Sequence, residues 1–264
     1  MFQLSVNLEY MFREAGDDLA HRAAAAARAG FTRVEIFRTD DRDLSALGAI
    51  LQDYGVELWT TVADPRTRLV DPATHEGFSQ LFRRAAEGAV ALGCRRVVVA
   101  SGPAVPYQKR GVQLETVTRA VSTAARVAEE LDVTILLEAV NTRVDHPGVL
   151  FSETQDAVAV VEAVASPRVR LLYDLYHSIA EGEDPPEVLP RVIDLVEHVQ
   201  IADHPGRGEP GSGRIDWERQ FRLLEDVGYT GVVGIECYPT KTPTADALKT
   251  VRELAASFGH NQEQ

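Results

Sequence analysis

Short apolar runs alternate with helical segments along the whole chain, and this alternation restricts the fold more than any other feature. The runs are short, rich in apolar and β-branched residues and bounded by polar ones, which is typical of a parallel strand buried on both faces. The runs are LSVN, VEIF, VELWTTV, RVVVAS, TILLEAVN, VRLLYDLYH, HVQIAD and GVVGIECYP. A strand–helix–strand unit takes about 30 residues, and the chain has 264. The sequence therefore predicts a single (β/α)8 TIM barrel, one domain over residues 1–264.

Helical segments separate the runs, and glycines end several of them. We expect helices over 17–28, 44–54, 78–92 and 114–131. Glycine follows the first three of these, as expected where the backbone turns left-handed to close a helix. No proline- or serine-rich linker and no change in composition separates the units, which also favours one domain.

Four of the runs end in an oxygen-bearing side chain: Glu138, Asp174, Gln200 and Glu236. Parallel strands bring their carboxyl ends to one edge of a barrel, where barrel enzymes keep their chemistry. Carboxylates crowded at that edge would raise one another's pKa unless a cation neutralised them. Oxygen ligands suit Mg²⁺ or Mn²⁺ better than Zn²⁺. The pattern therefore predicts an enzyme with one divalent metal ion, Mg²⁺ or Mn²⁺.

Two further candidates lie in the segments after these strand ends. His177 follows Asp174 in the sequence DLYH; a single histidine is commonly structural, but this one follows a predicted ligand into an active-site loop. Arg207 lies in DHPGRGEPGSGR, where glycines and prolines exclude a helix. We expect Arg207 to approach the substrate when this loop closes.

Composition and charge exclude several classes of function. The formal net charge of −13 disfavours a nucleic-acid partner, because affinity for phosphate backbones comes mostly from clustered Lys and Arg. No basic amphipathic segment or long apolar stretch indicates a membrane partner. The few lysines lie outside the apolar runs, which argues against Schiff-base chemistry. Together with an N-terminus unlike a signal peptide and two separated cysteines, these features predict a cytoplasmic protein.

Several long motifs resemble the hydroxypyruvate isomerase family. They are VNLEYMFRE, EAVNTR, YDLYHSIAEGE, HVQIADHPGRGEPGSGRIDW and GYTGVVGIECYP. That family belongs to the xylose isomerase-like TIM barrels, together with ketose 3-epimerases and 2-oxo-tetronate isomerases. The resemblance is strongest from about Ile135 to Pro239 and covers all four strand-end oxygens.

The resemblance implies roles for individual residues. It implies that the four strand-end side chains hold the metal, and that Glu138 and Glu236 are also the two acid–base residues. His177 and Arg207 would contact the oxygens of the substrate. Glutamine at position 200 favours the hydroxypyruvate isomerases over the epimerases, which commonly have histidine at this position.

The implied reaction is an aldose–ketose isomerisation of a small hydroxy-carbonyl acid or sugar through an enediolate. Return of the proton to the same carbon from the other face would instead make a ketose 3-epimerase, and loss of water would make a dehydratase. Both alternatives stay open at this point. The loops FRTDDRDLS and SGPAVP differ from the family, so the particular substrate also stays open, as does a homo-oligomer.

Overall fold

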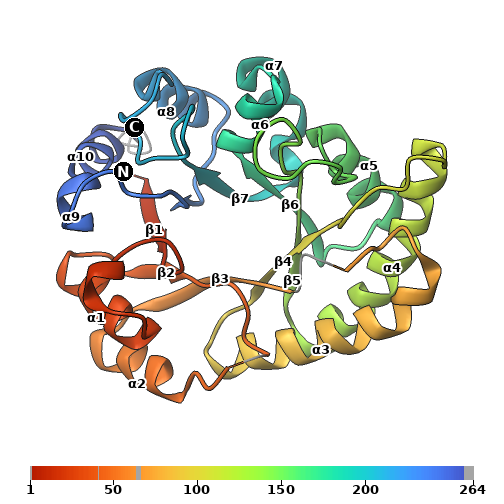
Figure 1. The fold of residues 1–264 in the computed structure, drawn as a ribbon, viewed down its shortest axis with the longest axis horizontal. Coiled ribbons are helices and arrows are strands. Elements are labelled where there is room, and N and C mark those ends of the chain that lie inside the picture. The colour runs from red at the N-terminus through yellow and green to blue at the C-terminus, as the bar shows by residue number, and fades with distance from the viewer. Residues whose placement is uncertain (1, 41, 64–66, 259–264) are drawn as a thin grey trace.

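The computed structural model describes residues 2–40, 42–63 and 67–258, and its strands form one closed parallel barrel with helices outside it (Figure 1). The strand order is β1 to β8 in sequence, and β8 pairs with β1 to close the barrel. This confirms the predicted TIM barrel. The strands are β1 (Gln3–Asn7), β2 (Arg33–Glu35), β3 (Glu57–Val62), β4 (Arg96–Ala100), β5 (Thr134–Glu138), β6 (Val169–Asp174), β7 (Val196–Ile201) and β8 (Val232–Ile235).

Two of the helices begin in polar residues that precede the apolar pattern. The α-helices are α1 (Leu19–Arg28), α2 (Ser45–Tyr54), α3 (His75–Ala91), α4 (Arg110–Leu131), α5 (Thr154–Val164), α6 (Leu175–Glu181), α7 (Pro185–Val192), α8 (Trp217–Asp226), α9 (Thr244–Ala247) and α10 (Lys249–Ser257). α3 and α4 each begin about one turn before the expected start, because a polar first turn has no apolar periodicity. Within the described residues, no helix is long and apolar enough to cross a membrane.

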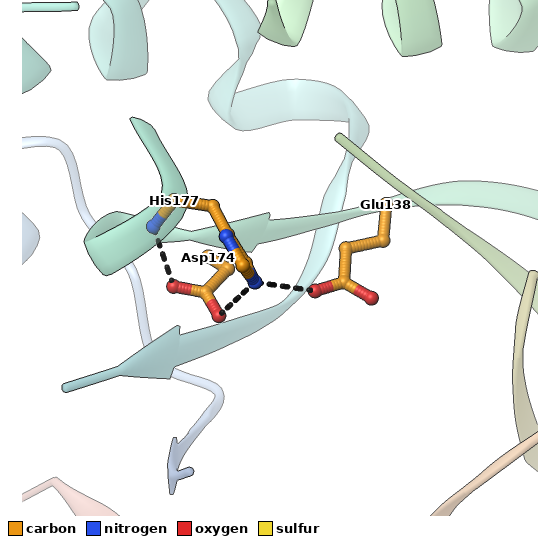
Figure 2. A group of neighbouring side chains, drawn as sticks. All are labelled: Glu138, Asp174 and His177. Carbon is orange, nitrogen blue, oxygen red and sulfur yellow. Dashed lines mark hydrogen bonds and ion pairs between the residues drawn. The ribbon is translucent and has the colours of Figure 1, made fainter. Parts of the chain in front are cut away.

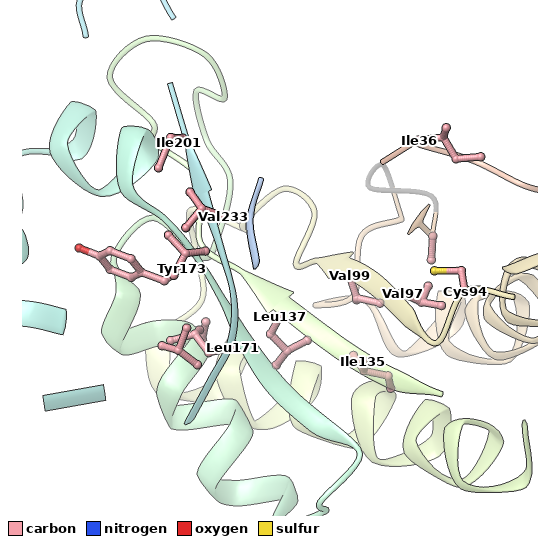
Figure 3. Close-up of a cluster of buried hydrophobic side chains, with 14 of the residues drawn as sticks. Ile36, Cys94, Val97, Val99, Ile135, Leu137, Leu171, Tyr173, Ile201 and Val233 are labelled. Atoms are coloured by element: carbon pink, nitrogen blue, oxygen red, sulfur yellow. The ribbon is translucent and has the colours of Figure 1, made fainter. Parts of the chain in front are cut away.

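One face of each strand packs against the surrounding helices and forms the main hydrophobic core. Figure 3 shows this layer, with Val97, Val99, Ile135, Leu137 and Leu171 pointing away from the barrel axis. All five are at most 2% exposed. The alternating residues of the same strands therefore point into the barrel.

The barrel interior divides into an apolar half and a polar half. Val98, Leu136 and Leu172 form a separate buried cluster on β4 to β6. The opposite half, which we call the polar half of the interior, consists of Ser5, Glu35, Thr60 and His198, each at most 1% exposed. Their side chains hydrogen-bond to one another through Glu35, so the burial of this charge is compensated.

A glycine makes room for the polar half. Gly234 on β8 lies against Glu35 and His198, and a Cβ atom built at Gly234 would collide with Glu35 Oε1 and lie 2.8 Å from His198 Nε2. Only a residue without a side chain therefore fits between this pair and β8.

Strand register brings the predicted site residues to one edge. Asp174 pairs with Gln200 across β6 and β7, and Gln200 pairs with Gly234 across β7 and β8. Glu138 ends β5, and Glu236 follows β8 directly. The carboxyl ends of the strands therefore carry all four oxygen-bearing side chains.

Candidate active site

A cavity of about 320 Å³ lies at the carboxyl edge of the barrel. Five of the six predicted site residues line it: Glu138, His177, Gln200, Arg207 and Glu236. The remaining wall is aromatic, aliphatic and basic: Tyr10, Phe37, Arg38, Arg42, Val62, Val98, Ala100, Val140, His146 and Val149. The volume suits a small polar substrate, at the lower end of the range for small-molecule sites.

The sixth predicted residue, Asp174, forms a cluster with Glu138 and His177 (Figure 2). His177 Nε2 lies 3.7 Å from Asp174 Oδ2 and 3.9 Å from Glu138 Oε1. The backbone N–H of His177 donates to Asp174 Oδ1 at 3.1 Å, because Asp174 is the N-cap of α6. The potential ligand atoms of the three residues lie within 4.8 Å of one another, a separation that one cation could span.

Hydrogen bonds decide what His177 can do in this cluster. Its Nδ1 lies 3.2 Å from the backbone N of Asn141 and 2.7 Å from Asn141 Nδ2. The oxygen Oδ1 of Asn141 accepts from two backbone N–H groups, which fixes the orientation of the amide. Two donors therefore face Nδ1, and a neutral ring must carry its hydrogen on Nε2. The Nε2 atom, 3.9 Å from Glu138 and 3.7 Å from Asp174, therefore presents an N–H group to these carboxylates and no lone pair for a metal.

Glu236 is held by three N–H donors. Arg207 Nη2 donates to Glu236 Oε1 at 2.6 Å. Asn7 Nδ2 and Gln200 Nε2 donate to Glu236 Oε2 at 3.0 and 3.1 Å. Hydrogen bonds of this kind favour the ionised carboxylate. Glu138 differs, since its Oε1 lies 3.9 Å from Nε2 of the His177 ring.

Arg207 lies in the site, where its Nη2 contacts Glu236; its approach to the substrate by closure of the loop stays a prediction. Its side chain is buried, with 5% exposure, and its guanidinium lies 5.1 Å from the ring centre of Tyr176 and 5.8 Å from that of Tyr10. The glycine-rich loop is fixed by Asp203, which accepts hydrogen bonds from Trp217 Nε1 at 2.8 Å and Gly211 N at 2.7 Å. Those bonds hold the loop against the barrel.

Burial and mutual repulsion perturb the acids of the site. Burial and the charges of Glu236 and Asp174 raise the pKa of Glu138 well above its usual value. Burial raises the pKa of Glu236 to about 7, although Arg207 opposes the shift. The pKa of Asp174 is also raised, chiefly by burial. Burial and the positive charge of Arg207 lower the pKa of His177, so that its ring is neutral.

The donor set fits a divalent cation. Three carboxylates with raised pKa values lie at the carboxyl edge of the barrel, and a cation would relieve their repulsion. Gln200 adds an amide oxygen beside them, and hard oxygen donors of this kind suit Mg²⁺ or Mn²⁺. Ligation by Glu138, Asp174, Gln200 and Glu236 stays a prediction.

Several residues of the site were missed from the sequence. Asn7 and Tyr10 come from the first strand and its loop, and Asn141 positions His177. Glu35 lies below Gln200 and accepts from its Nε2 at 2.7 Å. The one indication of Glu35 in the sequence is a charge inside the apolar run VEIF, where an unpaired carboxylate would be costly.

The raised pKa values predict an unusual dependence of stability on pH in the metal-free protein. A carboxyl whose pKa is higher in the folded state than in the unfolded state stabilises the fold below its usual value of 4.5. That contribution is lost as the pH rises towards the folded-state value, about 7 for Glu236. Removing one of these charges should therefore stabilise the metal-free protein at pH 8.

We expect Glu138→Gln to raise the free energy of unfolding of the metal-free protein at pH 8 by about 1 kcal/mol, or about 2–4 °C in Tm. At pH 4 the gain should disappear, because the wild-type carboxyl is then protonated. Thermal unfolding of both proteins in a chelating buffer measures the difference. If Glu138→Gln were less stable than wild type at pH 8, the ionised Glu138 would not destabilise the fold as we expect.

Comparison with known proteins identifies the family. The family model described as "Xylose isomerase-like TIM barrel" matches residues 23–254, and the chain belongs to that family. Its relatives include the hydroxypyruvate isomerase of Escherichia coli, 29% identical over 93% of this chain and 96% of that protein. A 2-oxo-tetronate isomerase of Cupriavidus necator is 30% identical over 90% and 94%. These relatives confirm the resemblance seen in the motifs.

A solved structure from Brucella melitensis shares the whole architecture. It is described as an AP endonuclease, family 2, and matches with a TM-score of 0.88 at 28% identity. The match covers 96% of this chain and 99% of that one. The barrel therefore extends over nearly all of both chains.

Proposed function

We propose that the protein is a divalent-metal-dependent isomerase that moves a proton between adjacent carbons of a small hydroxy-carbonyl acid or sugar. One observation carries the proposal: two glutamates in different environments, Glu236 buried and Glu138 partly buried, line one cavity of about 320 Å³. Glu236 is fixed by three N–H donors, whereas Glu138 lies beside the Nε2–H of His177. Pairs of acids whose environments differ in this way suit acid–base catalysis.

The protein is an isomerase, since relatives that cover most of its length are named hydroxypyruvate isomerase and 2-oxo-tetronate isomerase. Both names describe small hydroxy-carbonyl acids as substrates of those proteins. The size of the cavity and the net charge of −13 support a small molecule rather than a nucleic acid for this chain as well.

We assign the metal to Glu138, Asp174, Gln200 and Glu236, as the sequence predicts. A divalent ion held by these residues would polarise a carbonyl and acidify the neighbouring C–H. A metal of this kind also neutralises the carboxylates that repel one another in its absence.

The residues of the chain divide the proton transfer between them. Glu236 is the base, because its three N–H donors stabilise the carboxylate that must remove the proton from carbon. Glu138 delivers a proton to the neighbouring carbon. His177 Nε2–H and the guanidinium of Arg207 hold the substrate oxygens and stabilise negative charge as it develops on the enediolate.

The proposal is tested with hydroxypyruvate, 2-oxo-tetronates and free ketoses in D₂O containing Mn²⁺ or Mg²⁺. An isomerase gives an isomeric product that carries deuterium on the carbon next to the original C–H, as NMR detects. The proposed function is wrong if none of these compounds is converted.

Two other results of this experiment would indicate a different reaction at the same site. Deuterium on the original carbon with inverted configuration would indicate a ketose 3-epimerase. A product lighter by one water, with the absorbance of an unsaturated compound, would indicate a dehydratase on the same site.

A further inference from the structure

Glu35 connects the buried polar half of the barrel to the candidate metal site. It ends β2, is 1% exposed, and contacts Gln200, which lines the cavity. Its Oε1 accepts hydrogen bonds from Ser5 and from His198 Nε2, the latter at 3.0 Å. Its Oε2 accepts from Thr60 Oγ1 at 3.0 Å and from Gln200 Nε2 at 2.7 Å. Every contact of this carboxylate is thus with a donor.

The side chain of Gln200 has two possible amide orientations, and the neighbouring carboxylates select one. Its Nε2 lies 2.7 Å from Glu35 Oε2 and 3.1 Å from Glu236 Oε2. Carboxylate oxygens only accept hydrogen bonds, so both N–H bonds of the amide point at them. The opposite orientation would place Oε1 against two carboxylates. The amide oxygen is therefore the atom left to face the cavity that Gln200 lines.

We infer that Glu35 is a positioning residue that fixes the amide of Gln200 so that its oxygen, and not its nitrogen, is presented to the metal. The inference rests on the proposed metal-dependent function. An amide nitrogen cannot ligate a divalent ion, whereas an amide oxygen can. Removing the hydrogen-bond partner of a ligating side chain typically lowers metal affinity by about 10–100-fold.

The surroundings of Glu35 are shaped for this role. Gly234 on β8 leaves the space that Glu35 and His198 occupy, since a Cβ there would collide with Glu35 Oε1. Trp59 Nε1 lies 3.2 Å from Nδ1 of His198 and fixes the ring on its other side. Four hydrogen-bond donors fix the carboxylate of Glu35, and the fixed carboxylate in turn orients the amide of Gln200.

Two substitutions at Glu35 separate positioning from charge. Glu35→Leu and Glu35→Gln both remove the negative charge, but only glutamine retains an oxygen that can accept from Gln200 Nε2. We expect Glu35→Leu to weaken Mn²⁺ binding by about 10–100-fold, and Glu35→Gln to recover most of that loss. Calorimetric titration of the full-length protein with Mn²⁺ alone measures both values.

Glu115→Gln provides the matched control, because it removes the charge of an exposed carboxylate on α4 that lines no part of the cavity. It should bind Mn²⁺ as wild type does. Equal affinities in the leucine and glutamine variants, or wild-type affinity in the leucine variant, would overturn the positioning role while leaving the proposed function intact. No Mn²⁺ binding by the wild type would overturn the metal site, and this inference with it.

A second measurement does not depend on the folding of the leucine variant. In wild type, both side-chain amide protons of Gln200 should be downfield-shifted in NMR spectra and exchange slowly with solvent, since both are hydrogen-bonded to buried carboxylates. Gln200→Glu removes these signals and so assigns them. Rapid solvent exchange of either proton would refute the fixed orientation.

Discussion

Glu236→Gln should abolish both turnover and the exchange of the substrate C–H proton with solvent, whereas Glu138→Gln should abolish turnover alone. The difference arises because Glu236 is assigned to remove the proton and Glu138 to deliver one. Loss of a general acid or base costs about 10²–10⁴-fold in rate, and loss of a charge that also holds the metal adds to it. Steady-state kcat and deuterium incorporation into recovered substrate, followed by NMR, measure the two steps separately.

Glu115→Gln provides a matched control, because Glu115 is an exposed residue on α4 that lines no part of the cavity. Its turnover and proton exchange should match those of wild type. Full turnover in either glutamate variant would refute the two-glutamate proposal. Exchange lost in Glu138→Gln and kept in Glu236→Gln would reverse the assignment of the two roles.

Removal of divalent ions should reduce activity to background, and Mn²⁺ or Mg²⁺ should restore it. Burial is the main cause of the raised pKa values of Glu138, Asp174 and Glu236, and repulsion adds to it at the two glutamates, from Glu236 and Asp174 at Glu138 and from Asp174 at Glu236. A metal removes this repulsion as well as polarising the substrate carbonyl, so its loss affects both binding and proton transfer.

Dialysis against a chelator followed by an activity assay tests metal dependence, with the apo protein checked for an intact fold by circular dichroism. Adding back Mn²⁺ should also raise Tm, because a ligand that binds only the folded state stabilises it. Full activity after exhaustive chelation would refute the metal dependence.

Periodicity made the fold predictable, and strand register made much of the site predictable. Apolar runs of strand length identify the barrel because both faces of a parallel strand are buried. Once the order of strands is known, the residues at their carboxyl ends must meet at one edge. Glu138, Gln200 and Glu236 accordingly line the same cavity, and Asp174 lies beside Glu138.

Side-chain hydrogen bonds between distant segments could not be predicted in the same way. The hydrogen position on His177 depends on Asn141, whose own amide is fixed by a turn in its loop. Arg207 was expected on a moving loop, because the abundance of glycine is visible in the sequence whereas the bonds to Asp203 are not. Glu35 is visible in the sequence as a charge in an apolar run, but its four donors come from three other strands, β1, β3 and β7.

The hydrogen bond between Asn7 and Glu236 joins the first strand of the barrel to the end of the last. These two residues are 229 positions apart in the chain, and they meet only when β8 has paired with β1. During synthesis on the ribosome, Asn7 emerges long before Glu236, which lies 229 positions later. A nascent chain lacking β8 therefore has neither the proposed base nor a closed barrel, and any half-barrel intermediate is catalytically silent.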